Sequence, residues 1–251
     1  MAKFIPRLFY DNTLSLTTNI TLNAQQQHYL RVVLNKKQGD DVYLFNGNDG
    51  QWHCTIEQIN KKNITLCARE LVQNTLKTKP LALAFSNIKP KPLEFMITKA
   101  VELGVTYLQP IICAQAQHQF PNRDKIQSWI IDAVQQSGRF QIPILANEIA
   151  FDQLEHSASA QQNLWIACEN DCILPQYPIK QLLHDHQCTQ VMMVIGPTGG
   201  FHKREFALMQ EWTNNHDHIN IMSLGKHIMR AETAAIAALS CWQAISGDWI
   251  C

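Results

Sequence analysis

The fold is decided by the stretch Val191-Met192-Met193-Val194-Ile195-Gly196-Pro197-Thr198-Gly199-Gly200-Phe201. Its first five residues are apolar and a Gly/Pro cluster follows, which is typical of a fully buried strand that ends at a sharp turn. Residues 203–212 then place apolar side chains at helical spacing, so the predicted unit is strand, glycine turn and helix. The carboxyl end of a parallel strand is the usual ligand site of an α/β sheet. From these residues alone, the glycines either approach a ligand or only form the turn.

The composition indicates an ordinary globular protein. Of the 251 residues, 46% are hydrophobic and 17% are charged. No apolar run approaches the roughly 20 residues of a membrane helix, and the first residues do not resemble a signal peptide, so we expect a cytoplasmic protein. The 8 cysteines lack the spacing of a zinc site or a disulfide scaffold. We therefore expect free thiols and no metal.

The net charge is zero, but the charges are unevenly distributed. Residues 1–139 contain 16 Lys and Arg against 10 Asp and Glu, whereas residues 140–251 contain 5 against 11. A basic first half is suited to following a phosphate backbone. The alternative is an uneven solvated surface without function.

Two regions differ in their patterns. Residues 1–74 read as all-β with one short helix at 23–34, which predicts a small barrel. Its strand candidates are 7–10, 19–22, 41–45, 51–56 and 63–67. From 78 to 251, strands alternate with helices, which predicts a parallel α/β sheet. The strand candidates there are 81–85, 105–113, 163–168, 191–195 and 219–225, and the helix candidates are 93–103, 124–137, 179–184, 203–212 and the alanine-rich part of 226–239.

The second glycine turn, at residues 223–225, also follows a strand, so two successive glycine loops can enclose one ligand. Neither loop has the motif of a nucleoside triphosphate or dinucleotide site, and no esterase elbow or metalloprotease motif is present. Arg230 lies beside the second loop and suits an anion or a phosphate. The alternative for Arg230 is an ion pair with Glu232.

The sequence resembles that of a known family, the RsmE family of ribosomal RNA small-subunit methyltransferases E. The resemblance spans nearly the whole chain and is carried by Arg7-Leu8-Phe9 and residues 28–40, 99–105, 135–139, 196–201 and 224–234. It implies a PUA-like β-barrel that helps to hold RNA, followed by a SPOUT α/β domain with a trefoil knot. It further implies S-adenosylmethionine (SAM) as the cofactor, a homodimer, and methylation of N3 of a uridine in 16S ribosomal RNA of the small subunit.

The resemblance also implies the site residues. The cofactor-binding residues would be Ala167, Cys168, Glu169, Ile195, Gly196, Pro197, Thr198, Gly199, Gly200, Ser223, Leu224, Gly225, Ile228, Met229 and Ala231. The RNA-binding residues would be Arg7, His28, Arg31, Lys99 and Arg139. N3 of uracil carries a proton and becomes a good nucleophile only when that proton leaves, so catalysis needs a group that stabilises the imide anion. We predict that Arg230 is this catalytic residue.

Four residues depart from the family pattern, and each replaces a charged residue. Thr198 stands for a Glu, Asn35 for an Arg, Gln135 for a Glu and Gln115 for an Arg. Loss of two Arg residues is expected to weaken the grip on phosphate, and Thr198 alters a loop beside the cofactor. Two alternatives therefore stay open: a catalytically weakened paralogue that acts as an RNA-binding module, and a SPOUT methyltransferase with another RNA target. Trp242 and Trp249 are candidates for a subunit interface or for the core.

Overall fold

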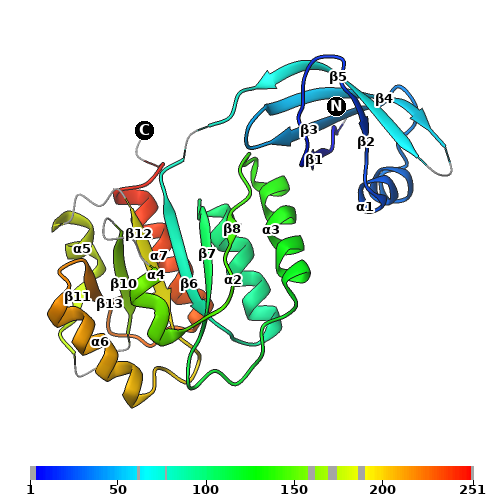
Figure 1. The fold of residues 1–251 in the computed structure, drawn as a ribbon. Coiled ribbons are helices and arrows are strands. Elements are labelled where there is room, and N and C mark those ends of the chain that lie inside the picture. The colour runs from blue at the N-terminus through cyan, green and yellow to red at the C-terminus, as the bar shows by residue number, and fades with distance from the viewer. Residues whose placement is uncertain are drawn as a thin grey trace. The chain divides into compact units, whose positions relative to one another are not determined.

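The computed structural model describes residues 4–60, 63–76, 78–157, 162–168, 174–185 and 190–249 (Figure 1). The chain forms two compact units, and each is described by itself below. The first unit comprises Met1–Lys77 and Val134–Ile142, and the second comprises Thr78–Ala133 and Pro143–Cys251. Residues 134–142 thus group with the amino-terminal unit, although they are distant from it in sequence.

The first unit is built on a curled five-stranded sheet with the order β1-β3-β4-β5-β2. Strand β1 pairs parallel with β3, and the other pairs are antiparallel. The strands are β1 (Arg7–Phe9), β2 (Asn19–Thr21), β3 (Asp41–Asn46), β4 (Gly50–Ile59) and β5 (Ile64–Gln73). Alternate strand residues such as Leu8, Val42 and Leu44 are buried in one hydrophobic core, as period-two patterning predicts.

The predicted helix at 23–34 is divided in two. Asn23 caps α1 (Ala24–His28) through a capping box with Gln26, and the π-helical turn η1 (Tyr29–Val33) follows directly. Leu30 is fully buried, so this segment closes the core of the first unit. The division was not visible in the sequence, because a single i→i+5 turn of five residues is too short to show a periodicity of its own.

The second unit contains a parallel sheet with the order β11-β13-β10-β12-β6-β7-β8, and β9 pairs with β7. Every recorded pairing in this sheet is parallel. The strands are β6 (Leu81–Ser86), β7 (Tyr107–Ile112), β8 (Ile144–Leu145), β9 (Ile149–Ala150), β10 (Asn163–Ala167), β11 (Tyr177–Pro178), β12 (Val191–Ile195) and β13 (Ile219–Ser223). All residues of β6 and β12 are buried, because helices cover both faces of the sheet.

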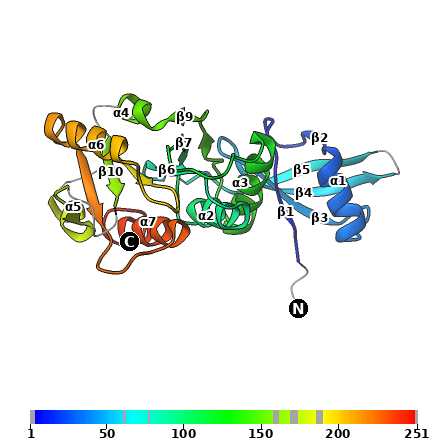
Figure 2. The ribbon, with the colours of Figure 1, turned by 90° about the horizontal axis from the view of Figure 1, so that it is seen from below.

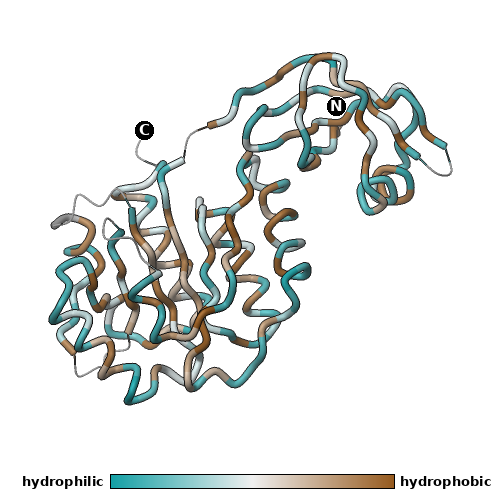
Figure 3. Tube along the Cα trace, viewed as in Figure 1, coloured by the Kyte–Doolittle hydropathy of each residue, from teal (hydrophilic) through white to brown (hydrophobic). Residues whose placement is uncertain are grey.

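The helices of the second unit lie on both faces of this sheet (Figures 1 and 2). Helices α2 and α7 pack together on one face, and α6 packs against the short helix η2 on the other. The helical elements are α2 (Pro90–Glu102), α3 (Arg123–Ser137), η2 (Phe151–Gln153), α4 (Leu154–Ser157), α5 (Ile179–Asp185), α6 (Lys203–Asn215) and α7 (Ala231–Ile245); the end of α3, from Val134, groups with the first unit. Hydrophobic and hydrophilic stretches alternate along α3, the amphipathic pattern from which it was predicted (Figure 3).

Two tryptophans near the carboxyl end have different environments. Trp242 on α7 is fully buried and belongs to the core, whereas Trp249 is 57% exposed. No helix in the described part of the chain is long and apolar enough to cross a membrane.

Candidate functional site: a glycine-loop cavity at the carboxyl ends of three strands

A cavity of about 440 Å³ lies at the carboxyl ends of β10, β12 and β13, which are neighbours in the sheet. Its size lies within the usual range of small-ligand sites, roughly 300–1,000 Å³. The lining residues are Ala167, Cys168, Ile195, Gly196, Pro197, Thr198, Gly199, Gly200, Phe201, Phe206, Leu224, Gly225, His227, Ile228, Met229, Arg230, Ala231 and Ala234. Three loops that are distant in sequence therefore form one site.

The loop after β12 is shaped by glycine. The N–H of Gly200 donates to the carbonyl of Pro197 at 2.9 Å, which closes a turn, and Gly200 has a φ of +73°. A β carbon on Gly196 would lie 2.7 Å from the ring of Phe201. Glycine at 196 thus lets the ring pack against the backbone at the start of the loop.

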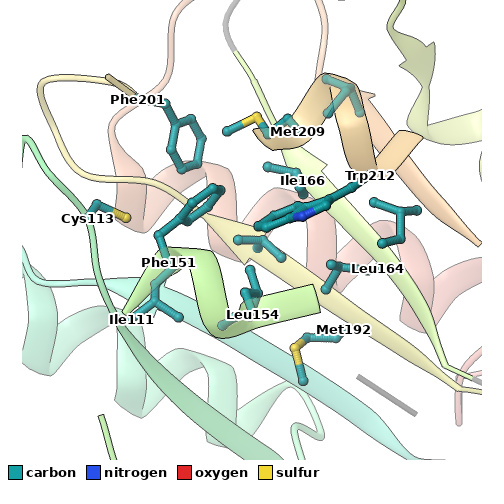
Figure 4. Close-up of a cluster of buried hydrophobic side chains, with 14 of the residues drawn as sticks. Ile111, Cys113, Phe151, Leu154, Leu164, Ile166, Met192, Phe201, Met209 and Trp212 are labelled. Atoms are coloured by element: carbon teal, nitrogen blue, oxygen red, sulfur yellow. The ribbon is translucent and has the colours of Figure 1, made fainter. Parts of the chain in front are cut away.

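Phe201 fixes the other end of this loop in the core (Figure 4). Its ring centroid lies 5.3 Å from that of Phe151, which stacks on Trp212 at 5.2 Å. Both Phe151 and Trp212 are buried. Aromatic packing of this kind stabilises the fold beyond simple area burial, so the glycine loop is held between a buried strand and a buried aromatic cluster.

The loop after β13 is formed in a similar way. Gly225 has a φ of +109°, and its N–H donates to Oγ of Ser223 at 3.4 Å. The N–H of Cys168 donates to the carbonyl of Met222 at 3.1 Å, which ties the loop after β10 to the end of β13. Ser223 thus supports the loop beside the cavity without being among the residues that line it.

Arg230 and His227 bring the polar chemistry to this cavity. Arg230 is exposed and precedes α7, with its carbonyl accepting the N–H of Ala234 at 2.8 Å. Among the described residues, no ion pair joins Arg230 to Glu232, so the alternative prediction for Arg230, a purely structural ion pair, is not supported. The guanidinium is available to an anion or a carbonyl oxygen in the cavity.

Most of the predicted cofactor residues come together. The exceptions are Ser223, which supports the loop from outside the lining, and Glu169, which lies outside the described residues. Sequence reasoning missed four lining residues: Phe201, Phe206, His227 and Ala234. Each directly follows a glycine loop or occupies the first turns of the next helix. This closeness to the loops in sequence could have predicted that they line the cavity.

A buried carboxylate supports the glycine loop from behind. Glu205 is 5% exposed, and its carboxylate accepts the N–H of His202 at 2.7 Å and that of Ala114 at 2.8 Å. Next to it, burial raises the pKa of the Cys113 thiol to about 12. Cys113 is therefore a neutral packing residue at physiological pH.

Arg7 is placed in a cage of carbonyl groups within the first unit. Its guanidinium donates to the carbonyls of Val134, Gln135, Gly138 and Arg139, at 2.6–3.4 Å, and its Nε donates to Oε1 of Gln51 at 2.7 Å. It also lies 3.3 Å above the ring of Phe45, and burial lowers its pKa to about 10. Because all five N–H groups of an Arg are engaged in this way, the geometry argues against a direct phosphate contact by Arg7.

The other predicted RNA-binding residues are distributed over both units. His28 is exposed at the end of α1, and Arg31 on η1 donates to Oε1 of Gln27 at 3.5 Å. Lys99 on α2 forms an ion pair of 2.7 Å with Glu102, and Arg139 is half-buried. Their role in RNA binding stays a prediction.

Two of the departures from the family pattern have local structural reasons. Asn35 has a φ of +49°, a left-handed conformation that Asn tolerates better than most residues. Oε1 of Gln135 accepts the N–H of Phe9 at 3.0 Å, so the amide oxygen can take the acceptor role of a carboxylate oxygen. Neither residue lines the cavity, whereas Thr198 does.

The described residues contain no group of three His, Cys, Asp or Glu side chains placed to hold a metal ion. Besides glycines and apolar side chains, the cavity is lined by Cys168, Thr198, His227 and Arg230, a mixture of apolar surface and a few polar groups that suits an organic ligand.

Comparison with known proteins is consistent with this architecture. A family model described as RNA methyltransferase domain matches residues 74–243, and one described as RNA methyltransferase PUA domain matches residues 22–66. A ribosomal RNA small subunit methyltransferase E from Rickettsia conorii is 29% identical over 235 residues, which cover 93% of each chain. The corresponding protein from Buchnera aphidicola subsp. Schizaphis graminum is 28% identical, with 99% of each chain covered.

Two solved structures are similar over almost the full chain. A methyltransferase from Legionella pneumophila, solved with bound SAM, has a TM-score of 0.83 at 27% identity and covers 98% of this chain and 100% of its own. A ribosomal RNA small subunit methyltransferase E from Neisseria gonorrhoeae has a TM-score of 0.82 with the same coverage. At 23% identity, this similarity shows a shared fold alone. The resemblance to the RsmE family and the predicted combination of a PUA-like domain with an α/β methyltransferase domain are confirmed, whereas the trefoil knot stays a prediction. Because the RNA methyltransferase model matches more than half of the chain, this protein belongs to that family of RNA methyltransferases and carries its PUA domain.

Proposed function

We propose that this chain is a SAM-dependent methyltransferase that methylates N3 of a uridine in 16S ribosomal RNA of the small subunit. The observation that carries the proposal is the convergence of three loops, predicted from widely separated motifs, on one cavity at the carboxyl ends of neighbouring strands. Relatives named for this activity align with nearly the whole chain.

The cavity fits SAM on structural grounds. Gly200 and Gly225 have positive φ, and Gly199 and Gly200 leave the loop without side chains, so backbone groups can approach a ligand closely. Apolar residues such as Leu224, Ile228 and Met229 offer surface for an adenine ring. SAM supplies an electrophilic methyl group on a sulfonium, and the loops of this chain would bind it and orient the methyl group toward the RNA.

Arg230 is the proposed anion stabiliser. When N3 of uracil loses its proton, negative charge spreads onto the two carbonyl oxygens, and a permanently charged guanidinium can hydrogen-bond one of them. Arg230 lines the cavity and, within the described residues, has no ion-pair partner. The stabiliser therefore does not have to break an internal contact before it acts.

His227 is the proposed acceptor of the N3 proton. Among the described lining residues, the titratable side chains are Cys168, His227 and Arg230, and imidazole is the one that ordinarily accepts a proton near neutral pH. His227 is exposed and lies three residues before Arg230 on the same loop. It can therefore meet a base that enters from solvent and return the proton to water.

The first half of the chain is the proposed RNA-holding part. We assign residues 1–74 to a PUA-like RNA-binding domain and residues 78–251 to the SPOUT domain with its trefoil knot. The excess of Lys and Arg over residues 1–139 supports this division, because phosphate contacts provide most of the affinity for RNA. We further propose a homodimer in the cytoplasm, for which exposed Trp249 and Ile228 are candidate contact residues.

The test combines SAM binding with methyl transfer. The protein is titrated with SAM by calorimetry and then incubated with isotope-labelled SAM and small subunits from cells that lack the family enzyme. Binding together with labelled 16S RNA supports the proposal. Binding without label indicates another RNA target, and absence of both indicates an RNA-binding module without catalysis.

A further inference from the structure

Gln115 reaches the glycine loop from a different part of the second unit. It lies in the turn after β7, where the N–H of Ala116 donates to the carbonyl of Cys113 at 3.1 Å. With its amide nitrogen facing the loop, Gln115 donates to the carbonyls of Gly199 at 2.5 Å and Gly200 at 3.3 Å. These two glycines line the cavity, although Gln115 itself is not among the lining residues.

The turn that carries Gln115 is held in place. The preceding residue, Ala114, donates its N–H to buried Glu205, which also caps the start of α6 through His202. Cys113, one residue further back, is 3% exposed and is anchored in the core. The backbone that carries the Gln115 side chain is therefore held in a fixed position.

The loop that receives these donors needs such restraint. Gly196, Gly199 and Gly200 have no side chains, and glycine loses more conformational freedom on ordering than any other residue. A loop that is ordered before binding does not have that entropy to lose when the ligand arrives. A β carbon on Gly199 would lie 3.3 Å from the end of the Gln115 side chain, so glycine at 199 also gives the amide room to approach.

We propose that Gln115 is a positioning residue that orders the glycine loop for SAM, acting through the carbonyls of Gly199 and Gly200. The proposal rests on the proposed function in one respect, the identity of the ligand. It differs from the sequence-based expectation that the residue at 115 matters for phosphate, because the side chain faces the cofactor loop. The affected quantity is therefore the affinity for SAM, and the salt dependence of RNA binding stays unchanged.

Variants of similar size separate the effect of the hydrogen-bond donors of Gln115 from the effect of its side-chain shape. Gln115→Glu keeps the size but replaces the NH2 group, with its two donors, by a carboxylate oxygen that repels the two carbonyls, and Gln115→Met removes the donors without adding charge. Gln115→Arg restores donors. Gln117→Glu, at an exposed position two residues along the chain, adds the same charge away from the loop and is the matched control.

Two measurements decide the proposal. In the ligand-free protein, hydrogen exchange of the 197–201 segment should become faster in Gln115→Glu and Gln115→Met and stay unchanged in Gln117→Glu. The dissociation constant for SAM should rise about 3- to 10-fold in the first two variants, as expected for the loss of one or two solvent-accessible hydrogen bonds, and should recover in Gln115→Arg. KM for SAM should rise with kcat nearly unchanged.

The proposal would be overturned if hydrogen exchange of the 197–201 segment in Gln115→Glu and Gln115→Met were as slow as in the wild type. It would also be overturned if that exchange were faster but the affinity for SAM were unchanged. If the parent protein itself binds no SAM, the proposed function fails, and the exchange measurement still decides whether Gln115 orders the loop.

Discussion

Oε1 of Glu205 accepts the backbone N–H of Ala114 at 2.8 Å, although 91 residues separate the two in sequence. The other carboxylate oxygen accepts the N–H of His202 at the start of α6. One buried side chain therefore joins the end of β7 to the helix that follows the glycine loop. This connection sets the position of the loop relative to the sheet.

Glu205→Gln should destabilise the second unit. The neutral amide has one oxygen in place of two, so one of the N–H groups of Ala114 and His202 loses its acceptor. An unsatisfied buried donor costs about 1–3 kcal/mol. Urea unfolding measures the change, with exposed Glu211→Gln on the same helix as the control. Equal stability of the two variants would show that Glu205 does not hold the turn.

Arg7→Lys should destabilise the first unit without altering how RNA binding depends on salt. Lysine cannot replace the four hydrogen bonds to the carbonyls of residues 134–139 and the fifth to Gln51, so several acceptors lose their partner and about 1–3 kcal/mol of stability is expected to be lost. The exposed Arg69–Glu57 pair provides the control, because Arg69→Lys should change stability by less than about 1 kcal/mol. A reduced salt slope for RNA binding in Arg7→Lys would instead identify Arg7 as a phosphate contact.

Gly196→Ala should lower both stability and SAM affinity, because the new methyl group meets the ring of Phe201. Overpacking of this kind costs about 1–3 kcal/mol. Adding Phe201→Leu removes the clash, so the double variant should be more stable than the sum of the two single changes predicts. Thermal unfolding and SAM titration of all four proteins measure this coupling, and strict additivity would argue against the contact.

Arg230→Ala and His227→Gln should reduce the rate of methyl transfer while leaving SAM affinity within a few-fold. Loss of the anion stabiliser is expected to lower kcat about 10²- to 10³-fold, and loss of the proton acceptor about 10²- to 10⁴-fold. Single-turnover kinetics with bound RNA measure the chemical step. Glu169→Gln tests the other ionisable side chain predicted at this site, and a larger defect there than in His227→Gln would reassign the proton acceptor.

Cys113 should resist alkylation in the native protein up to about pH 9. Burial raises the pKa of its thiol to about 12, so the reactive thiolate is scarce in the folded state. In the unfolded chain a thiol ionises near pH 8.5, so stability that derives from this neutral thiol decreases as the pH rises from about 9 toward 12. Half-buried Cys168 and Cys241 provide the comparison in iodoacetamide labelling followed by mass spectrometry. Labelling of native Cys113 at the rate of Cys168 would contradict its burial.

The core of the site could be predicted from sequence because its signals are local. The run from Val191 to Ile195 is uniformly apolar and ends in glycines, and the structure contains the predicted strand, glycine turn and helix. The alanine-rich segment likewise forms α7 from Ala231. In both cases burial and helix propensity favour the same local structure.

The remaining features depend on contacts between distant residues. The two-residue strands β8, β9 and β11 are too short to show a period, and nothing local in residues 134–142 reveals that they pack with the first unit. A sequence also does not distinguish an Arg that binds RNA phosphate from one that caps a helix end, because both need the same donors. Arg7 was predicted to bind RNA for that reason, and its contacts with backbone carbonyls support a structural role instead.

The most direct test of the account is nucleoside mass spectrometry of 16S RNA, after methyl transfer to small subunits from cells that lack the family enzyme. We expect 3-methyluridine to appear with the parent protein and to be absent with Arg230→Ala. Label on a different nucleoside, or equal 3-methyluridine with both proteins, would contradict it.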